Sequence, residues 1–277
     1  MIDLHVHSTA SDGSETPAAV VRMATAIGLT AIALTDHDTQ AGTAEAQQAA
    51  ADSGLELIPG TELSLEWGQG AMHLVVLFLS PEAGPLQDRL AELRQGRLER
   101  NGRILGKLAE IGMPLLEAEV LELARGESVG RPHIAAAMMQ RGYVESIAEA
   151  FDMYLARGRP AYTPRLRLSP EDAIGLARKS GAVPVLAHPH TLGLNSSEEV
   201  AGTLRRLTDA GLIGMECYYS SYSPLEREGY AALAERFGLT ASGGSDYHGT
   251  YKPEVTLGSG RGNLVVPDRL LDALRPG

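Results

Sequence analysis

The chain has 277 residues, of which 24 are lysine or arginine and 35 are aspartate or glutamate, so its net charge is −11 with neutral histidines. A protein this acidic repels long polyanions over most of its surface, so we expect no binding of duplex nucleic acid, although a small local anion site is compatible with the charge. The longest apolar stretch, residues 74–79, is far shorter than the roughly 18 residues that a membrane span needs, so we expect no membrane protein. With 44% hydrophobic residues, we expect no disordered chain either.

Strand-like and helix-like patterns alternate through the first eighty residues. Thr16 and Pro17 are typical of a helix N-cap and first turn, and Gly28 and Gly54 each follow a helical pattern. We expect strands at residues 2–7, 30–35, 55–65 and 72–79, and helices at residues 17–28 and 43–53.

The middle of the chain breaks this alternation, because residues 85–158 contain only helical patterns. The helices expected there span residues 85–111, 114–124, 132–142 and 144–156. We therefore expect a helical insertion, residues 83–158, within a barrel formed by residues 1–82 and 159–277.

The alternation resumes after the insertion. Helices are expected at residues 170–179, 198–210 and 224–237, and strands at residues 183–187, 213–216 and 239–243. This order predicts an α/β fold with a largely parallel sheet, and closure into a barrel is the natural way to bury such a sheet at this length.

The chain contains one cysteine, Cys217, and therefore cannot form an internal disulfide bond. With no secretion signal expected either, a bacterial-type cytoplasm is the expected compartment. Any bound metal must be held mostly by nitrogen and oxygen atoms.

Most of the eight histidines fall at or just after the carboxyl ends of expected strands, where an α/β barrel gathers its functional groups. His5 and His7 are two residues apart, so on a strand their side chains point to the same side and can hold one ion. Asp12 follows in the first loop and offers a hard oxygen ligand. The competing interpretation of the two histidines is a polar edge strand.

Charged residues crowd the end of the second expected strand, where Asp36, His37 and Asp38 follow Thr35. Charges at the mouth of a buried strand need partners, and a metal would supply them. The alternative is a helix N-cap, which is more plausible for Asp38 than for His37.

The later strand ends repeat the pattern. Glu62 lies in the third expected strand, His73 opens the fourth, His188 and His190 cap another, and Glu216 ends the next. After the last strand, Asp246 and His248 repeat the spacing of His5 and His7. Together these residues predict a polynuclear metal centre.

These motifs, in this order, resemble the PHP (polymerase and histidinol phosphatase) superfamily over residues 2 to about 250. The residues that carry the resemblance are His5-Val6-His7, Asp12, Thr35-Asp36-His37-Asp38, Glu62, His188-Pro189 and Ser245-Asp246-Tyr247-His248. The resemblance implies a distorted (β/α)7-type barrel with an inserted all-helical subdomain. It implies three divalent ions: the first on His5, His7, Glu62 and Asp246, the second on Glu62, His73 and His188, and the third on Asp12, His37 and His248.

The helical insertion is similar to that of small bacterial phosphoesterases that act on nucleoside 3′,5′-bisphosphates and short 5′-phosphorylated RNA. The resemblance thus implies removal of a 3′-phosphate, with trimming of short RNA from its 5′ end as an extension. Two ions bridged by a carboxylate can deprotonate a water, and the hydroxide then attacks phosphorus while the third ion neutralises phosphate oxygens. The nitrogen and oxygen ligands suit Mn²⁺, which we favour, and also Zn²⁺ or Fe²⁺.

Substrate contacts are expected from the insertion, where Arg97 and Asn101 interrupt an apolar stripe of the long helix that runs from Leu86 to Ile111. They suit an anion held over the metals, and a buried salt bridge or a solvent gap explains them equally well. Arg131 and His133, at the start of a helix, form a second candidate phosphate site.

His133 and His190 are candidate proton donors to the leaving group. The tyrosines Tyr218, Tyr219 and Tyr222 can stack on a base or sugar, although loop packing is the commoner role of such a group. Two other functions remain open: a histidinol-phosphate-type phosphomonoesterase, and a non-catalytic metal-binding regulatory module.

Overall fold

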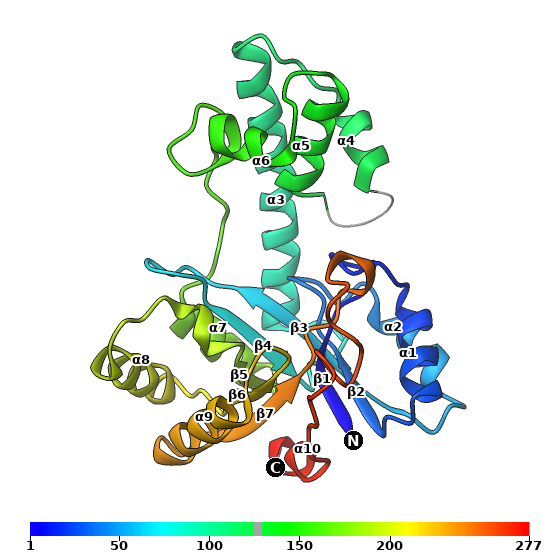
Figure 1. Cartoon of the computed structure of the whole chain (residues 1–277), viewed down its shortest axis with the longest axis vertical. Coiled ribbons are helices and arrows are strands. Elements are labelled where there is room, and N and C mark those ends of the chain that lie inside the picture. The colour runs from blue at the N-terminus through cyan, green and yellow to red at the C-terminus, as the bar shows by residue number, and fades with distance from the viewer. Residues whose placement is uncertain (125–128, 277) are drawn as a thin grey trace. The chain divides into compact units, whose positions relative to one another are not determined.

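The computed structural model describes residues 1–124 and 129–276 of the chain (Figure 1). The chain divides into two compact units: a barrel unit, Met1–Leu90 with Arg167–Gly277, and a helical unit, Ala91–Leu166. The boundaries predicted from sequence, 83 and 158, each lie eight residues before those of the helical unit. The long helix explains the difference at the first boundary, because its first turns, with Leu86 and Leu90, are buried in the barrel unit.

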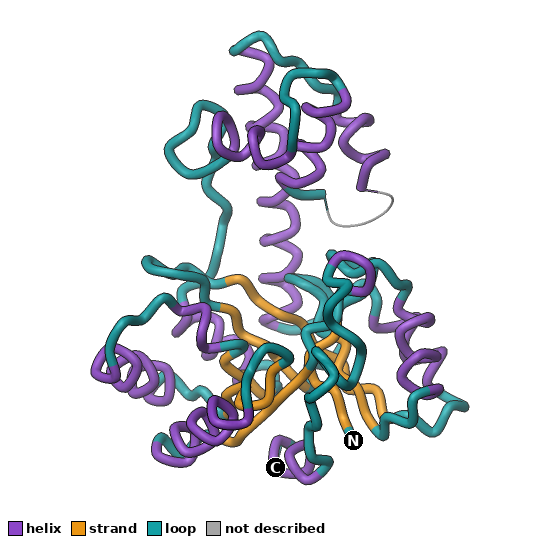
Figure 2. The backbone as a smooth tube through the Cα atoms, in the orientation of Figure 1, coloured by secondary structure: helices purple, strands orange, loops and turns teal. Residues whose placement is uncertain are grey.

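Seven strands form the sheet of the barrel unit in the order β1 to β7. Figure 2 shows the strands in orange. They are β1 (Ile2–Val6), β2 (Ala31–Leu34), β3 (Glu56–Ser64), β4 (His73–Leu77), β5 (Val183–Leu186), β6 (Gly214–Tyr219) and β7 (Thr240–Gly244). The segment after β7 returns to β1, where the amide of His7 donates to the carbonyl of Tyr247 at 3.0 Å and the amide of Asp246 donates to the carbonyl of His5 at 2.9 Å. The sheet is therefore nearly closed, and the predicted α/β barrel is confirmed.

The sheet is largely parallel, as predicted, but β4 runs antiparallel to both β3 and β5. The reason is the short connection between β3 and β4, which contains no helix and can only return the chain in the opposite direction. Because β4 is reversed, its first residue lies at the same edge of the sheet as the carboxyl ends of the parallel strands.

Helices flank the sheet along the barrel unit. They are α1 (Pro17–Ala26), α2 (Thr43–Ala50), α7 (Pro170–Lys179), α8 (Ser197–Asp209), α9 (Pro224–Arg236) and α10 (Arg269–Leu274), with short 3₁₀ turns η2 (Pro189–Leu192) and η3 (Gly249–Tyr251). Several begin at a serine or threonine cap: the hydroxyl of Thr16 accepts from the amide of Ala19, as the Thr16-Pro17 pattern predicts. The apolar side of α10 packs with alternate residues of β1, β2, β4 and β5 in one core.

The helical unit has a core of its own, which includes Ile104, Leu108, Ile134 and Met138. Its elements are the greater part of α3 (Pro85–Glu110), α4 (Glu117–Ala124), α5 (Arg131–Gln140), α6 (Ile147–Ala150) and a π-helical turn η1 (Phe151–Leu155). The helix expected at residues 144–156 is thus a short α-helix that continues into a π-helical turn. Throughout the described residues, no helix combines the length and apolar character of a membrane span.

Candidate metal centre

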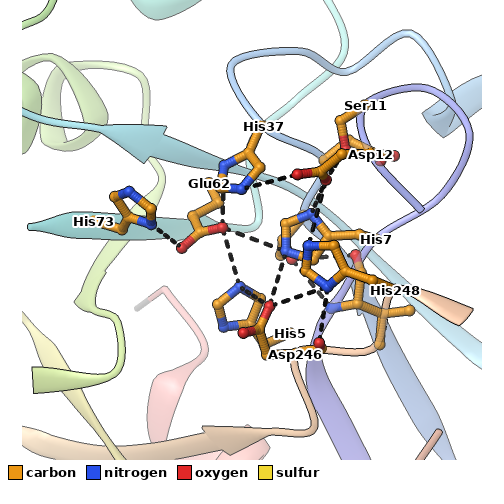
Figure 3. A network of polar contacts seen from close by, with 12 residues as sticks. His5, His7, Ser11, Asp12, His37, Glu62, His73, Asp246 and His248 are labelled. Carbon is orange, nitrogen blue, oxygen red and sulfur yellow. Dashed lines mark hydrogen bonds and ion pairs between the residues drawn. The ribbon is translucent and has the colours of Figure 1, made fainter. Parts of the chain in front are cut away.

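The predicted ligands come together at one edge of the barrel (Figure 3). His5 lies in β1, Glu62 in β3, and His73 is the first residue of the reversed strand β4. The others lie within four residues after a strand or in the loop after β1; they are His7, Asp12, His37, His188, Asp246 and His248. Because the strand ends bring them together, residues up to 243 positions apart in sequence meet at this edge.

Glu62 stands at the centre of the cluster and is almost completely buried. Its Oε1 atom lies 2.9 Å from Nδ1 of His73 and 2.9 Å from Nε2 of His188. Its Oε2 atom lies 3.3 Å from Nε2 of His5 and 3.3 Å from Nε2 of His7. The carboxylate therefore faces two groups of histidines, one with each oxygen, as a carboxylate that bridges two ions would.

Asp246 completes the group around His5 and His7. Its Oδ1 atom lies 3.6 Å from Nε2 of His5 and 3.4 Å from Nε2 of His7. The backbone of Asp246 is left-handed, with φ of 57°, so strand alternation does not explain why Asp246 and His248 point the same way. Instead, the Nδ1 atom of His248 lies 2.9 Å from the carbonyl oxygen of Asp246, and this contact turns its ring toward the cluster.

A third group surrounds Asp12, whose side chain is half exposed. Its oxygens lie 3.5 Å from Nδ1 of His7, 3.6 Å from Nε2 of His37 and 3.4 Å from Nε2 of His248. The other nitrogen of His37 lies 3.1 Å from Glu62, so this ring connects the third group with the carboxylate at the centre.

The distances between the ligand atoms suit bound divalent ions better than direct hydrogen bonds between the side chains. Nε2 of His5, both ring nitrogens of His7 and Nδ1 of His37 are buried and make no hydrogen bond to any residue that the structure describes. They lie 3.1–3.6 Å from carboxylate oxygens. Two ligand atoms that each lie about 2.1 Å from one ion are separated by about 3.0–3.4 Å at tetrahedral or octahedral angles. The spacing is thus typical of atoms that share an ion.

The electrostatics of the cluster follow from burying acids and imidazoles together. Burial opposes charge on His5 and His7, yet the surrounding carboxylates hold the pKa of His5 well above its ordinary value and raise the pKa of His7 to about 10. Burial likewise opposes charge on Glu62 and Asp246, but the imidazoles hold the pKa of both carboxylates well below the usual range. Burial lowers the pKa of His37 to about 3. A metal must therefore displace protons from some of these imidazoles.

Several buried acids support the ligands from behind. The sequence pattern places Asp36 and Glu216 near the site, at the ends of two expected strands, but gives no such indication for Asp3. Asp36 accepts from the amide and hydroxyl of Ser8 at 2.8 and 2.7 Å and from the hydroxyl of Ser11 at 2.6 Å. It thereby fixes the loop that carries Asp12. Such supporting acids leave a weak signal in the sequence, because each one acts on a loop that is distant along the chain.

Asp3 supports the far end of the chain in the same way. Its carboxylate accepts from the amide and hydroxyl of Ser245 at 2.8 and 2.6 Å and from the amide of Gly258 at 2.8 Å. Ser245 directly precedes Asp246, so this buried carboxylate helps to hold the ligand that follows.

His190 lies beside the ligand His188, with 6.2 Å between ring centroids. Its Nδ1 atom is 3.0 Å from the hydroxyl of Tyr222, and its ring also neighbours that of Tyr219 at 5.3 Å. Burial and the neighbouring His188 lower the pKa of His190. Tyr218, by contrast, packs against the apolar core of the barrel, so the three tyrosines do not form one surface.

The other predicted substrate residues lie in the helical unit. Arg131 donates to the carbonyl of Leu155 at 3.0 Å and lies over the ring of Phe151 at 5.4 Å. Nδ1 of His133 accepts from the amide of Gly130 at 3.1 Å, which caps α5.

Arg97 and Asn101 lie on the predicted face of α3. Arg97 is half-buried, and buried Asn101 donates to the carbonyl of Val129 at 3.0 Å. The apolar stripe around them is buried as expected from Leu86 to Leu108, but Ile111 lies beyond the helix end and is exposed.

Comparison with known proteins identifies the family. Residues 3–111 match the family model described as the PHP domain. A 3′,5′-nucleoside bisphosphate phosphatase of Chromobacterium violaceum is 35% identical over 89% of this chain and 87% of its own length. The chain belongs to the PHP family.

Two further relatives cover most of this PHP chain. The 5′-3′ exoribonuclease Rnm of Escherichia coli is 36% identical over 89% of this chain and 84% of its own length. A solved structure from Bifidobacterium adolescentis, described as a candidate metal-dependent phosphoesterase, is 30% identical, covers 99% of this chain and 94% of its own, and has a TM-score of 0.80.

Proposed function

We propose that this PHP protein removes the 3′-phosphate of nucleoside 3′,5′-bisphosphates and also trims short 5′-phosphorylated RNA from its 5′ end. The protein is a hydrolase of phosphoric ester bonds, as the names of its relatives indicate. The observation that carries the proposal is the position of Glu62, which faces one group of histidines with each of its carboxylate oxygens.

Both substrates present the same bond to one site. In a nucleoside 3′,5′-bisphosphate and in the first nucleotide of a 5′-phosphorylated RNA, the bond to be broken joins phosphorus to O3′ of a nucleotide that carries a 5′-phosphate. One pocket that recognises the 5′-phosphate can therefore serve both reactions. The two kinds of relative, a bisphosphate phosphatase and a 5′-3′ exoribonuclease, support this pairing.

We assign three divalent ions, with Mn²⁺ favoured, to the three groups of ligands. The first would be held by His5, His7, Glu62 and Asp246, the second by Glu62, His73 and His188, and the third by Asp12, His37 and His248. Bound ions would activate a water for attack on phosphorus and neutralise phosphate oxygens. The protein contributes the fixed positions of the imidazoles and the shared carboxylate of Glu62.

His190 is our preferred proton donor to the leaving O3′. Its Nδ1 is held by the hydroxyl of Tyr222, which leaves Nε2 as the ring atom available to a substrate. His133 is the alternative donor, and its Nδ1 is already used by the capping contact with Gly130. Replacement of His190 by Gln should lower kcat more for substrates with a poor leaving group than for those with a good one.

The helical unit is suited to hold the second phosphate because its charge differs from that of the barrel unit. It contains 11 of the 24 basic residues but only 10 of the 35 acids, so its net charge is +1 and that of the remaining chain is −12. We assign this contact to Arg131 and to Arg97 of α3. The Oδ1 atom of Asn101, buried and without a hydrogen bond among the described residues, suits a donor such as a sugar hydroxyl.

The test compares Arg131→Ala with Arg141→Ala, an arginine of the same unit that pairs with Glu119 on the surface. Arg131→Ala should raise KM for a nucleoside 3′,5′-bisphosphate by about 10-fold or more, because a charge-assisted contact to phosphate is lost, and should change KM for a simple phosphomonoester little. Arg141→Ala should change neither. Equal effects of Arg131→Ala on both substrates, in a variant with an unchanged melting temperature, contradict the assignment. A panel that includes histidinol phosphate distinguishes the monoesterase alternative.

A further inference from the structure

The two carboxylate oxygens of Asp246 make different contacts. Oδ1 faces the ring nitrogens of three histidines in the cluster at 3.4–3.6 Å. Oδ2 accepts a hydrogen bond from the hydroxyl of Tyr219 at 2.7 Å and another from Nζ of Lys252 at 2.7 Å. Asp246 itself is almost completely buried, whereas the Lys252 side chain is 38% exposed at the rim.

These two donors saturate Oδ2. A carboxylate oxygen has two lone pairs, and here one receives a hydroxyl and the other an ammonium group. Both contacts are short, as expected when the acceptor is ionised. Oδ1 is then the one oxygen of Asp246 that remains for an ion.

The backbone fixes both donors in place. Tyr219 is the last residue of β6 and pairs with Gly244 of β7, two residues before Asp246. Its ring packs against those of His188 at 5.6 Å and Tyr222 at 5.3 Å.

Lys252 follows the 3₁₀ turn η3. Its amide donates to the carbonyl of Gly249 at 3.2 Å, and its carbonyl accepts from the amide of Val255 at 2.9 Å. The lysine stem therefore starts from an ordered turn only six residues after Asp246.

We infer that Tyr219 and Lys252 are positioning residues that occupy Oδ2 of Asp246 and so restrict this carboxylate to single-oxygen coordination of a metal ion. The inference rests on the proposed metal-dependent function. A ligand that binds through one oxygen leaves a coordination position open for water or substrate, whereas a two-oxygen ligand would fill it. Loss of either donor frees Oδ2 to take that position.

The experiment uses the full chain loaded with Co²⁺, whose visible absorption weakens as its coordination number rises. Lys252→Met and Tyr219→Phe should each lower the absorption of the saturated protein, leave Co²⁺ affinity undiminished, and reduce kcat by about 10-fold with a smaller change in KM. The affinity is not expected to fall in Lys252→Met because the variant removes a positive charge close to the ion. The double variant should resemble the single variants, since both open the same oxygen.

Three further variants complete the test. Lys252→Arg should restore the wild-type spectrum, because it retains a cationic donor. Lys179→Met, at an exposed lysine of α7, and Tyr218→Phe, at the neighbouring core tyrosine, should behave as wild type.

Wild-type spectra in both Lys252→Met and Tyr219→Phe overturn the inference. A rise in KM for Lys252→Met that exceeds its loss in kcat, with an unchanged spectrum, also overturns it and makes Lys252 a direct phosphate contact. Failure of the wild-type chain to bind Co²⁺ at all is a different outcome, because it overturns the proposed metal-dependent function itself.

Discussion

Oε1 of Glu216 lies 3.1 Å from Nδ1 of His5, on the side of the imidazole that faces away from Glu62 (Figure 3 shows His5 and Glu62). The other oxygen of Glu216 accepts from the amide of His188 at 2.7 Å. This buried carboxylate thus orients two of the proposed ligands, although it is not itself a proposed ligand. Acids in this position fix the ring orientation of a metal-binding histidine.

We predict that Glu216→Ala weakens metal binding by about 10- to 100-fold, because His5 loses the partner that orients its ring. Glu216→Gln, whose amide oxygen can still accept from Nδ1 of His5, should lose much less metal affinity. Competition with a coloured chelator measures both values. The exposed Glu228→Ala serves as control, and equal affinity of Glu216→Ala and this control would show that Glu216 does not support the site.

Asp36 should be important for stability as well as for the site. Asp36→Ala leaves three donors of Ser8 and Ser11 without their acceptor in a buried region, so we expect a loss of about 2–4 kcal/mol in the free energy of unfolding. Asp36→Asn should lose less, since the amide retains one acceptor oxygen. Urea denaturation of the metal-free protein measures the change, and a loss no larger than that of the exposed Asp52→Ala would contradict the role given to Asp36.

Gly249 allows the turn after His248 to pass close to Ser14. Its φ is 65°, and a Cβ atom at this position would lie 1.9 Å from Oγ of Ser14. Gly238 has the same φ of 65° but open space around it, so Gly238→Ala measures backbone strain alone, at about 1 kcal/mol. We expect Gly249→Ala to lower the free energy of unfolding by about 2–4 kcal/mol and to weaken metal binding.

A second substitution separates the cost of the steric clash with Ser14 from the cost of backbone strain. Ser14→Gly removes the clashing hydroxyl and also the acceptor of the Thr250 amide, so Gly249→Ala should lose clearly less free energy of unfolding in the Ser14→Gly background than in the wild type. Thermal or urea unfolding checks the series. An equal loss from Gly249→Ala in both backgrounds would show that backbone conformation alone determines the cost.

Metal affinity should rise with pH. In the metal-free protein the neighbouring carboxylates overcome burial and raise the pKa of His7 to about 10, so this ring carries a proton that a metal must displace at any pH below that value. Affinity should therefore increase by up to about tenfold per pH unit between pH 7 and 9 for each proton released. His37, whose pKa burial lowers to about 3, releases none in this range. Titration calorimetry in buffers of different ionisation enthalpy counts the protons, and release of none would contradict the charge state of the cluster.

The sequence predicts the barrel and the convergence of the proposed ligands because both depend on local signals. Strand ends are marked by apolar runs, and an imidazole shortly after such a run is visible in a single sequence, as at His37 and His188. The reversal of β4 was not predicted, although the lack of a helix between β3 and β4 indicates it. It leaves His73 at the predicted edge.

The supporting residues were harder to predict because they act across long sequence separations. Asp3 binds Ser245 and Gly258, and Asp36 acts on Ser8 and Ser11, with no periodic pattern that connects them. Left-handed backbone at non-glycine residues such as Asp246 is likewise a product of tertiary structure. Such conformations gather at functional sites because the surrounding contacts enforce them.

The most direct test of the account is metal-restored phosphate release. Protein stripped by a chelator is titrated with Mn²⁺ while phosphate release is followed from a nucleoside 3′,5′-bisphosphate and the two monophosphates. Release of nucleoside 5′-monophosphate is followed from a short 5′-phosphorylated RNA, and Glu62→Gln is assayed in parallel. We predict that activity returns as the metal binds, that kcat/KM for the bisphosphate exceeds that for the monophosphates, and that Glu62→Gln remains inactive. Metal-loaded wild-type protein that hydrolyses no phosphate ester, or Glu62→Gln that hydrolyses the bisphosphate as fast as wild type, would contradict the account.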